Sequence, residues 1–214
     1  MKSTNLIALI CVTLIACNNK SKTQFDNLIN SSDNPHFKKY QIFDDKNYLL
    51  TLRTFDTTSS YNIDHPTVIL NLLRSDETKI DTLVNDSIFS RNPIGAVPEI
   101  KIDFIDFNFD GVKDILIPYG TDPRGNHGFH LYLVDNNRKQ IQYMTGFKDI
   151  GNPKADSIYQ IIQSFVLAGP PFCRFYKINF DKELIDIDHY LEFSDFDSIE
   201  TKIQQQMKKI TTTR

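Results

Sequence analysis

From residue 37 onward, short apolar runs alternate with clusters of turn-forming residues, and this pattern constrains the fold more than any other feature of the chain. Ile100, Ile102 and Phe104 alternate with polar neighbours, as in a half-buried strand. We therefore expect mainly antiparallel β structure with eight or nine strands, in a sandwich-like or propeller-like domain. The clearest apolar runs are residues 48–55, 68–73, 80–84, 115–117, 129–134, 141–144, 157–166, 174–180 and 184–191.

The composition of the chain agrees with a β-rich fold. Its 214 residues include 22 Asp but only 5 Glu and 5 Ala, together with 16 Phe and 9 Tyr. Asp favours turns, whereas Ala and Glu favour helix interiors, and aromatic side chains suit strands. An all-helical fold is thereby disfavoured. A formal net charge of -3 and the lack of a long basic stretch also argue against a nucleic-acid-binding protein.

One helix is expected, at the C-terminal end. Asp197 can cap it, with Glu200 three residues later as in a capping box. The residues that fall on one face at helical spacing are Ile199, Ile203, Met207 and Ile210.

The N-terminal segment has the features of a bacterial lipoprotein signal. Lys2 precedes an apolar run at residues 6–16, which is too short to span a bilayer core of about 30 Å. The run ends in Leu14-Ile15-Ala16-Cys17, which resembles the lipobox of bacterial lipoproteins. The resemblance implies attachment of diacylglycerol to Cys17, cleavage before it and acylation of the new N-terminus. A simple secretory signal or a buried helix is the alternative.

These features divide the chain into three parts. Residues 1–16 are the predicted signal peptide, residues 17–35 a polar, lipidated tether, and residues 36–214 a β-rich calcium-binding domain. Position 18 is Asn and not the Asp that is associated with retention of lipoproteins in the inner membrane. No acidic run follows, as a signal for export to the cell surface would have. We expect a lipid anchor in the periplasmic leaflet of the outer membrane of the cell envelope. Cys173 is then the only free thiol, and we expect it to be a buried structural residue.

The motif D-x-N-x-D-G-x-x-D at residues 106–114 predicts a calcium site. Ca²⁺ takes six to eight oxygen ligands, and a loop that coils around the ion presents alternate side chains to it. The Gly at the sixth position permits the sharp turn. The predicted ligands are Asp106, Asn108, Asp110, the carbonyl of Val112, and Asp114.

Two features separate this loop from an EF-hand and limit its affinity. Position 12 is Ile117 instead of Glu, and the flanking segments read as strands. Without the bidentate Glu we expect a dissociation constant of about 10⁻⁴ to 10⁻⁶ M and a structural role for the ion. A metal-free Asx turn and a different cation remain as alternatives.

A second loop, at residues 120–128, is a candidate recognition edge because loops often carry binding residues. An ordinary solvated loop is the alternative. The sequence has no G-x-S-x-G, P-loop or G-x-G-x-x-G motif, so we expect a binding protein and not an enzyme. The candidate partner-binding residues are Tyr119, Asp122, Arg124, Asn126 and His127.

The calcium loop resembles those of FG-GAP and integrin-α-type repeats. From about residue 100 to 192, the segments DFNFDGVKDILI, HLYLVDNN and FYKINF resemble a family of periplasmic lipoproteins. The known members are immunity proteins that inhibit lysozyme-like peptidoglycan hydrolases delivered by type IV secretion. The resemblance implies a membrane-anchored envelope protein whose partner is such a hydrolase. An envelope enzyme acting on glycan or peptide, and a structural lipoprotein of an envelope complex, are the other two hypotheses.

Overall fold

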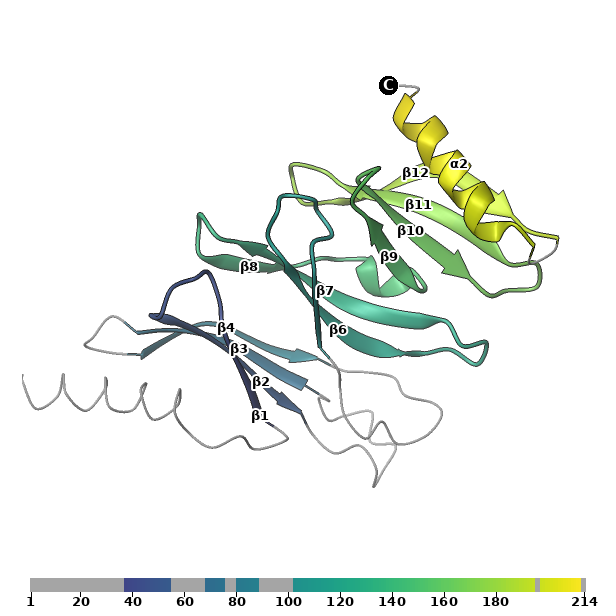
Figure 1. Cartoon of the computed structure of the whole chain (residues 1–214). Helices are drawn as coiled ribbons and strands as arrows, with labels where there is room; N and C mark the ends of the chain where they lie inside the picture. Colours follow the sequence, from purple (N-terminus) through teal and green to yellow (C-terminus); the bar gives the residue numbers. More distant parts are fainter. Residues whose placement is uncertain (1–36, 55–67, 76–79, 89–101, 195–196, 213–214) are drawn as a thin grey trace, which may run out of the picture. The chain divides into compact units, whose positions relative to one another are not determined.

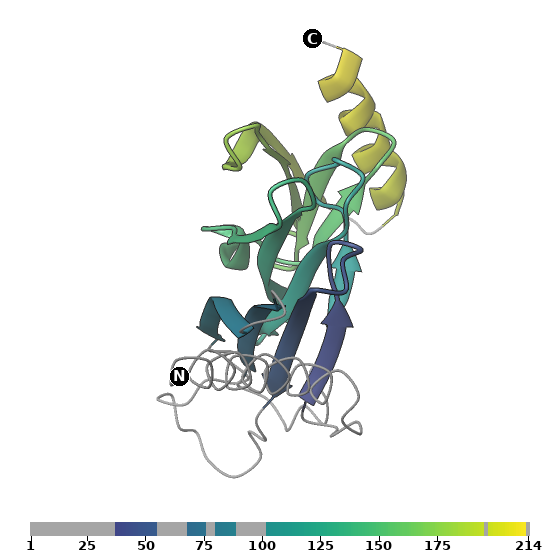
Figure 2. The same ribbon diagram turned by 90° about the vertical axis from the view of Figure 1, so that its left-hand side faces the viewer.

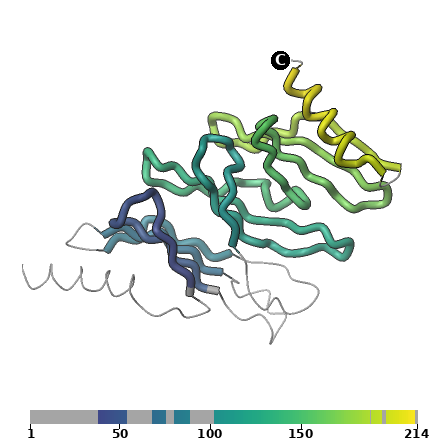
Figure 3. Tube along the Cα trace, viewed as in Figure 1, coloured from purple at the N-terminus to yellow at the C-terminus, as the bar shows by residue number. Residues whose placement is uncertain are grey.

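A computed structural model describes residues 37–54, 68–75, 80–88, 102–194 and 197–212 (Figure 1). Figure 3 traces these segments in colour along the chain. The chain divides into two compact units, Met1–Phe89 and Ser90–Arg214, and each is described by itself. The predicted signal peptide and tether, including Cys17, lie outside the described residues.

The first unit contains one sheet of four consecutive antiparallel strands, in the order β1-β2-β3-β4. Leucines pair across its two central strands, with Leu50 opposite Leu72 and Leu52 opposite Leu70. These side chains are at most 1% exposed, so they form the buried part of the sheet. The strands are β1 (Phe37–Gln41), β2 (Tyr48–Thr54), β3 (Val68–Ser75) and β4 (Ile80–Ile88).

The second unit repeats this arrangement twice and adds a helix. Its two sheets have the orders β5-β6-β7-β8 and β12-β11-β10-β9, and each is an antiparallel meander of consecutive strands. The first sheet consists of β5 (Asp103–Ile105), β6 (Asp114–Thr121), β7 (His127–Asp135) and β8 (Gln140–Tyr143), followed by the 3-10 turn η1 (Phe147–Asp149). The second consists of β9 (Pro153–Asp156), β10 (Ile161–Val166), β11 (Phe172–Ile178) and β12 (Leu184–Glu192), followed by α2 (Ile199–Thr212).

Successive side chains of a strand point to opposite faces of its sheet, and this explains the layers of the second unit. Ile162 on β10 belongs to a core cluster with Leu131 and Leu133 of β7, so the two sheets pack face to face. The neighbouring residue Ile161 points to the other face and packs with Ile203 and Met207 of α2. The helix runs beside this sheet in Figure 1 and in the turned view of Figure 2. The order of layers is sheet, sheet, helix.

The prediction of a mainly β fold with a short C-terminal helix is confirmed. The expected helix face is also correct, because Ile203, Met207 and Ile210 are buried and Ile199 packs against the same cluster. The helix begins at Ile199, however, so its capping position is held by Ser198 instead of Asp197.

The described residues contain twelve strands, more than the eight or nine expected. One cause is that the apolar run at 157–166 begins with a turn, and only Ile161–Val166 forms β10. The turn joins β10 to β9, which begins at Pro153 and lies outside the apolar runs. Proline is tolerated there because β9 is an edge strand and Pro153 is its first residue.

Among the described residues, no helix is both long enough and apolar enough to cross a membrane.

Candidate functional site

The predicted calcium loop connects β5 to β6 and is fixed to the core by two aromatic side chains. Phe107 is fully buried in the cluster between the sheets, and Phe109 packs against that cluster. Between and beyond these anchors the backbone must turn sharply. Phe109 and Gly111 adopt left-handed conformations, with φ of 61° and 86°. The glycine at the sixth position of the motif therefore serves the turn that the sequence predicted for it.

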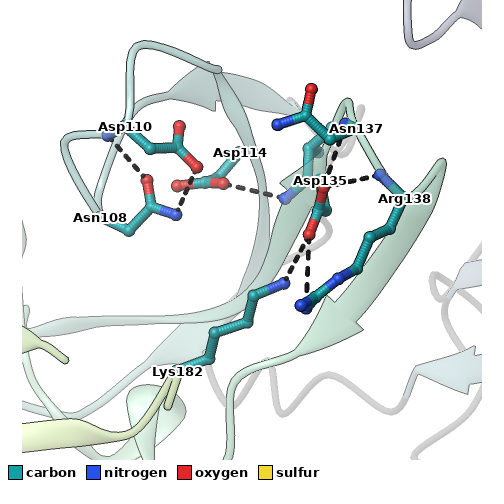
Figure 4. A network of polar contacts seen from close by, with 8 residues as sticks. Asn108, Asp110, Asp114, Asp135, Asn137, Arg138 and Lys182 are labelled. Carbon is teal, nitrogen blue, oxygen red and sulfur yellow. Dashed lines mark hydrogen bonds and ion pairs between the residues drawn. The ribbon is translucent and has the colours of Figure 1, made fainter. Parts of the chain in front are cut away.

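Short hydrogen bonds hold the polar side chains of the loop in place. Asp106 Oδ2 accepts from the backbone N–H of Gly111 at 2.9 Å, and Asp110 Oδ1 accepts from that of Val112 at 2.8 Å. Asn108 accepts from the N–H of Asp110 through Oδ1 and donates from Nδ2 to Asp110 Oδ2 at 2.9 Å (Figure 4). The four side chains that the motif places at positions 1, 3, 5 and 9 thus belong to one turned loop.

Asp114 closes the loop from inside the core. Its side chain is fully buried, and its two oxygens accept the backbone N–H groups of Phe107 at 2.9 Å and Val134 at 3.0 Å. Burial raises the pKa of Asp114 to about 7, against the lowering effect of these two hydrogen bonds, and the charges of Asp110 and Asp106 raise it further. The charge of Asp114 therefore lies where water cannot easily screen it, whereas Asp110 is exposed.

Asp106 has a carboxylate oxygen without a hydrogen-bond partner among the described residues. Its Oδ1 atom is buried and has no hydrogen-bond partner within the described part of the chain. A carboxylate oxygen in that situation has strong acceptor capacity left, and carboxylate, amide and carbonyl oxygens are the ligands that Ca²⁺ prefers. Over the same described ranges, no three His, Cys, Asp or Glu side chains lie close enough together to hold a metal ion. The loop residues are the right chemical type for calcium, and their side chains bond to loop amides.

A second polar network adjoins the loop through β7. Asp135 follows Val134 and receives Lys182 Nζ at 3.4 Å from the β11–β12 turn, as well as Arg138 Nη1 at 3.9 Å (Figure 4). Hydrogen bonds from the Arg138 backbone N–H and from Lys182 hold the pKa of Asp135 below its ordinary value. The calcium loop, the β7–β8 turn and the β11–β12 turn are consequently linked at one end of the second unit.

The candidate recognition loop lies at the opposite end of β6. That strand runs from Asp114 to Thr121 and β7 starts at His127, so the loop itself is only residues 122–126. Seven strand residues, 115–121, separate Asp114 from the loop, and the rise from Asp114 to Thr121 is about 23 Å at 3.3 Å per residue. An ion held at residues 106–114 would therefore not contact this loop directly.

An asparagine network holds the recognition loop instead. Asn126 is only 6% exposed, donates to Asp122 Oδ2 and to the Leu167 carbonyl at 2.8 Å each, and accepts from the Leu167 N–H at 2.7 Å. Asn152 donates to Asn126 Oδ1 at 3.0 Å. The bond from the Asn126 side chain is the main reason why the pKa of Asp122 is lowered. Asn126 and Asp122 thus shape the loop.

The remaining candidate recognition residues differ in exposure. Arg124 and His127 are exposed, and His127 Nδ1 lies 2.8 Å from the Thr121 hydroxyl. Tyr119 is half-buried: its ring packs edge-on against His130 at 5.2 Å between centroids and lies 5.6 Å below Lys148 Nζ. A Cβ atom at Gly128 would meet the Tyr119 ring at 3.2 Å, so this glycine permits the close packing. Tyr119 therefore contributes to packing as well as to the surface.

Sequence reasoning missed three residues that organise these sites. Val134 contributes only its backbone N–H, which no side-chain pattern reveals. Asn152 and Lys182 act on residues 26 and 47 positions away in sequence, and neither belongs to a motif. Cys173 is fully buried as expected, and burial raises its thiol pKa to about 12.

No protein-family model, no curated protein and no solved structure matches the chain.

Proposed function

We propose that the protein is a calcium-stabilised binding lipoprotein of the bacterial cell envelope, anchored through Cys17. The observation that supports this proposal best is the loop at residues 106–114. Its oxygens are oriented by backbone N–H donors, its motif has calcium-loop spacing, and Asp106 Oδ1 is buried without a partner among the described residues. The ligands are Asp106, Asn108, Asp110, the Val112 carbonyl and Asp114.

The role of the ion is structural. Three carboxylates within nine residues repel one another, and the buried one is the hardest to ionise. A divalent cation offsets that repulsion and stabilises the folded loop between β5 and β6. The carboxylates accept hydrogen bonds from backbone N–H groups, and each oxygen retains a lone pair for an ion.

The location follows from the N-terminal segment. A thioether-linked diacylglycerol and an N-terminal acyl chain at Cys17 give stable anchoring, because more than one chain is buried in the bilayer. The polar composition of residues 17–35 suits a solvated tether between the anchor and the domain. We assign the protein to the periplasmic leaflet of the outer membrane.

The partner is an envelope protein, and a lysozyme-like peptidoglycan hydrolase is the first candidate because of the resemblance described above. Such an interaction makes the protein an inhibitor that protects the peptidoglycan of its own cell. The two folded units and the structural ion suit this role because a preorganised surface loses little conformational entropy on association.

A hydrolase assay tests the proposal. A c-type lysozyme acts on purified peptidoglycan while the full mature protein is added in calcium or in EDTA, and soluble muropeptides are measured. We expect release to fall in proportion to the protein added in calcium. Asp110→Ala should inhibit more weakly, whereas Asp149→Ala, an exposed carboxylate in η1, should act as wild type. Lysozyme activity that is unaffected at stoichiometric excess contradicts the assigned partner, and muropeptides released by the protein alone contradict the non-enzymatic role.

A further inference from the structure

In three hairpin turns of the second unit, the side chain of the opening residue bonds to the backbone of the turn. Each opens with an Asp or Asn whose side-chain oxygen accepts a backbone N–H of the turn, and each contains a residue other than glycine in the left-handed region. The left-handed residues are Lys139, Gln160 and Lys182, with φ of 54°, 51° and 60°. The turns join β7 to β8, β9 to β10 and β11 to β12.

The tips of these turns differ in chemistry. The β7–β8 turn carries Asn136 and Asn137, whereas the β9–β10 turn carries Ile158, which is 83% exposed, and the β11–β12 turn carries Phe180, which is fully exposed. The asparagines show that such a turn forms without an apolar side chain at its tip. The matching β9–β10 turn therefore does not require Ile158 at its tip, and the side-chain hydrogen bonds that hold the β11–β12 turn join Asn179 and Glu183 and not Phe180. Exposed aromatic and large aliphatic side chains are typical of contact surfaces.

The two apolar tips lie at the same end of one sheet. The start of β10 is paired with the end of β11, with Ile162 opposite Tyr176, so the turns before β10 and after β11 extend in the same direction. The β11–β12 turn is also tied to β7 by the Lys182–Asp135 ion pair. Val134, the residue before Asp135, donates its N–H to Asp114 of the calcium loop. Phe180 is thus presented on a turn that is braced against the proposed metal site.

The charges beside the tips favour one kind of partner. Asp181 and Glu183 are exposed next to Phe180, and Asp156 lies two residues before Ile158. These carboxylates are repelled by the anionic lipids of a bilayer surface. They complement a protein surface on which basic side chains surround an apolar depression.

We propose that Ile158 and Phe180, with Asp156, Asp181 and Glu183 around them, form the contact surface for a protein partner that offers an apolar pocket with a basic rim. This inference rests on the proposed function only in assigning a binding role to the protein. It places the contact at the calcium-loop end of the second unit and away from residues 122–126. Phe180 is the principal anchor because it is the larger of the two apolar tips and the more exposed.

Site-specific photo-crosslinking in cells that carry the full-length chain tests the surface. Benzoylphenylalanine replaces Phe180, Ile158 or, as a control on the tip of another hairpin turn, Asn136. We expect protein-sized adducts from positions 180 and 158 and none from position 136. The cross-linked protein is then identified by mass spectrometry and purified, and its affinity is measured for wild type, Phe180→Ser and Asn136→Ser. Phe180→Ser should weaken binding about tenfold or more, and Asn136→Ser less than about twofold.

The controls separate this inference from the function proposed above. Thermal unfolding of Phe180→Ser should match wild type, because the side chain is fully exposed. Equal adducts at 136 and 180, no adduct at 180, or unchanged affinity of Phe180→Ser would overturn the contact surface. A membrane partner is tested with the non-acylated Cys17→Ser chain and vesicles of 3:1 phosphatidylethanolamine–phosphatidylglycerol. If this chain sediments with the vesicles and Phe180→Ser abolishes the sedimentation, the surface binds a membrane and not a protein. A cross-linked protein that is not a peptidoglycan hydrolase leaves the surface intact and removes only the hydrolase from the proposed function.

Discussion

Asp114 combines burial, hydrogen bonding and nearby negative charge in one side chain. Its pKa in the folded protein is raised to about 7 from an ordinary value of 3.8, mainly because it is buried. Between those two values the folded state binds more protons than the unfolded state. The free energy of unfolding of the metal-free protein must therefore fall as pH rises through this interval.

We predict that, in EDTA, lowering the pH from 8 to 5.5 raises the melting temperature, because protonation removes a buried charge. Asp114→Asn should show a flatter pH profile, since it has no proton to bind. The comparison of slopes isolates Asp114 from other titrating groups. Parallel profiles for the two proteins would mean that this carboxyl does not titrate in the folded state as described.

Asn126 is the second residue with a decisive local role. Its amide joins the turn at Asp122 to the backbone of Leu167 across 41 positions of sequence. Asn126→Ala leaves the Leu167 N–H and carbonyl without their side-chain partner and removes one of the two acceptors of the Asn152 amide, and we predict a loss of about 2–4 kcal/mol in the free energy of unfolding. Denaturant titration measures the loss, and Arg124→Ala, which changes an exposed neighbour, is the control. Equal stability of the two variants would show that the network contributes little.

At the scale of elements, β6 carries the two candidate sites at its two ends. The calcium loop precedes Asp114, and the loop at 122–126 follows Thr121. Since the asparagine network fixes the second loop without the ion, metal binding should affect the ends of the strand differently. This separation could not be read from the sequence, in which Gly120 stands only six residues after Asp114.

We predict that removal of calcium accelerates amide hydrogen exchange at residues 106–114 and at Val134, whose N–H is bonded to Asp114. Exchange at residues 122–126 should change little, because Asn126 and Asn152 hold that loop. Exchange measured by mass spectrometry with and without EDTA gives both readouts. If calcium removal strongly accelerated exchange at residues 122–126 alone, the ion and the second loop would be coupled, contrary to what the length of β6 suggests.

Sequence patterns predicted those features of the structure that depend on neighbouring residues. Alternating apolar residues predicted the mainly β fold, and the spacing of Ile203, Met207 and Ile210 predicted the buried helix face. The first residue of the helix and the edge strand β9 were missed, because Ser198 before the helix has a left-handed backbone and the sequence PKAD of β9 contains no apolar run. Contacts such as Asn126 with Leu167 depend on which strands become neighbours, and local patterns do not contain that information.

At the scale of the whole molecule, each of the three sheets is built from four consecutive strands, although the sequence shows no internal repeat. Similar meanders formed from dissimilar sequences indicate that the turns and the alternation of apolar residues determine this arrangement. The folded part of the chain follows a polar segment and the proposed lipobox, and under this proposal its position in the cell depends on Cys17.

We predict that Cys17→Ala moves the protein from the membrane fraction to the soluble fraction or leaves the signal segment uncleaved, because the thioether cannot form. Fractionation with an immunoblot, together with the electrophoretic mobility, distinguishes these outcomes. Cys173→Ala, which changes a buried thiol of the folded unit, should remain with the membrane. A Cys17→Ala protein with unchanged fraction and mobility would contradict lipidation at this residue.

The most direct measurement of the central claim is the melting temperature of the mature protein in calcium and in EDTA. A ligand at a hundredfold excess over its dissociation constant adds about 2.7 kcal/mol to the free energy of unfolding, which corresponds to roughly 5–10 °C in a chain of this size. We predict such an increase for wild type and for Asp149→Ala, and none for Asp110→Ala. Identical melting temperatures of wild type in the two buffers would contradict a calcium site at residues 106–114.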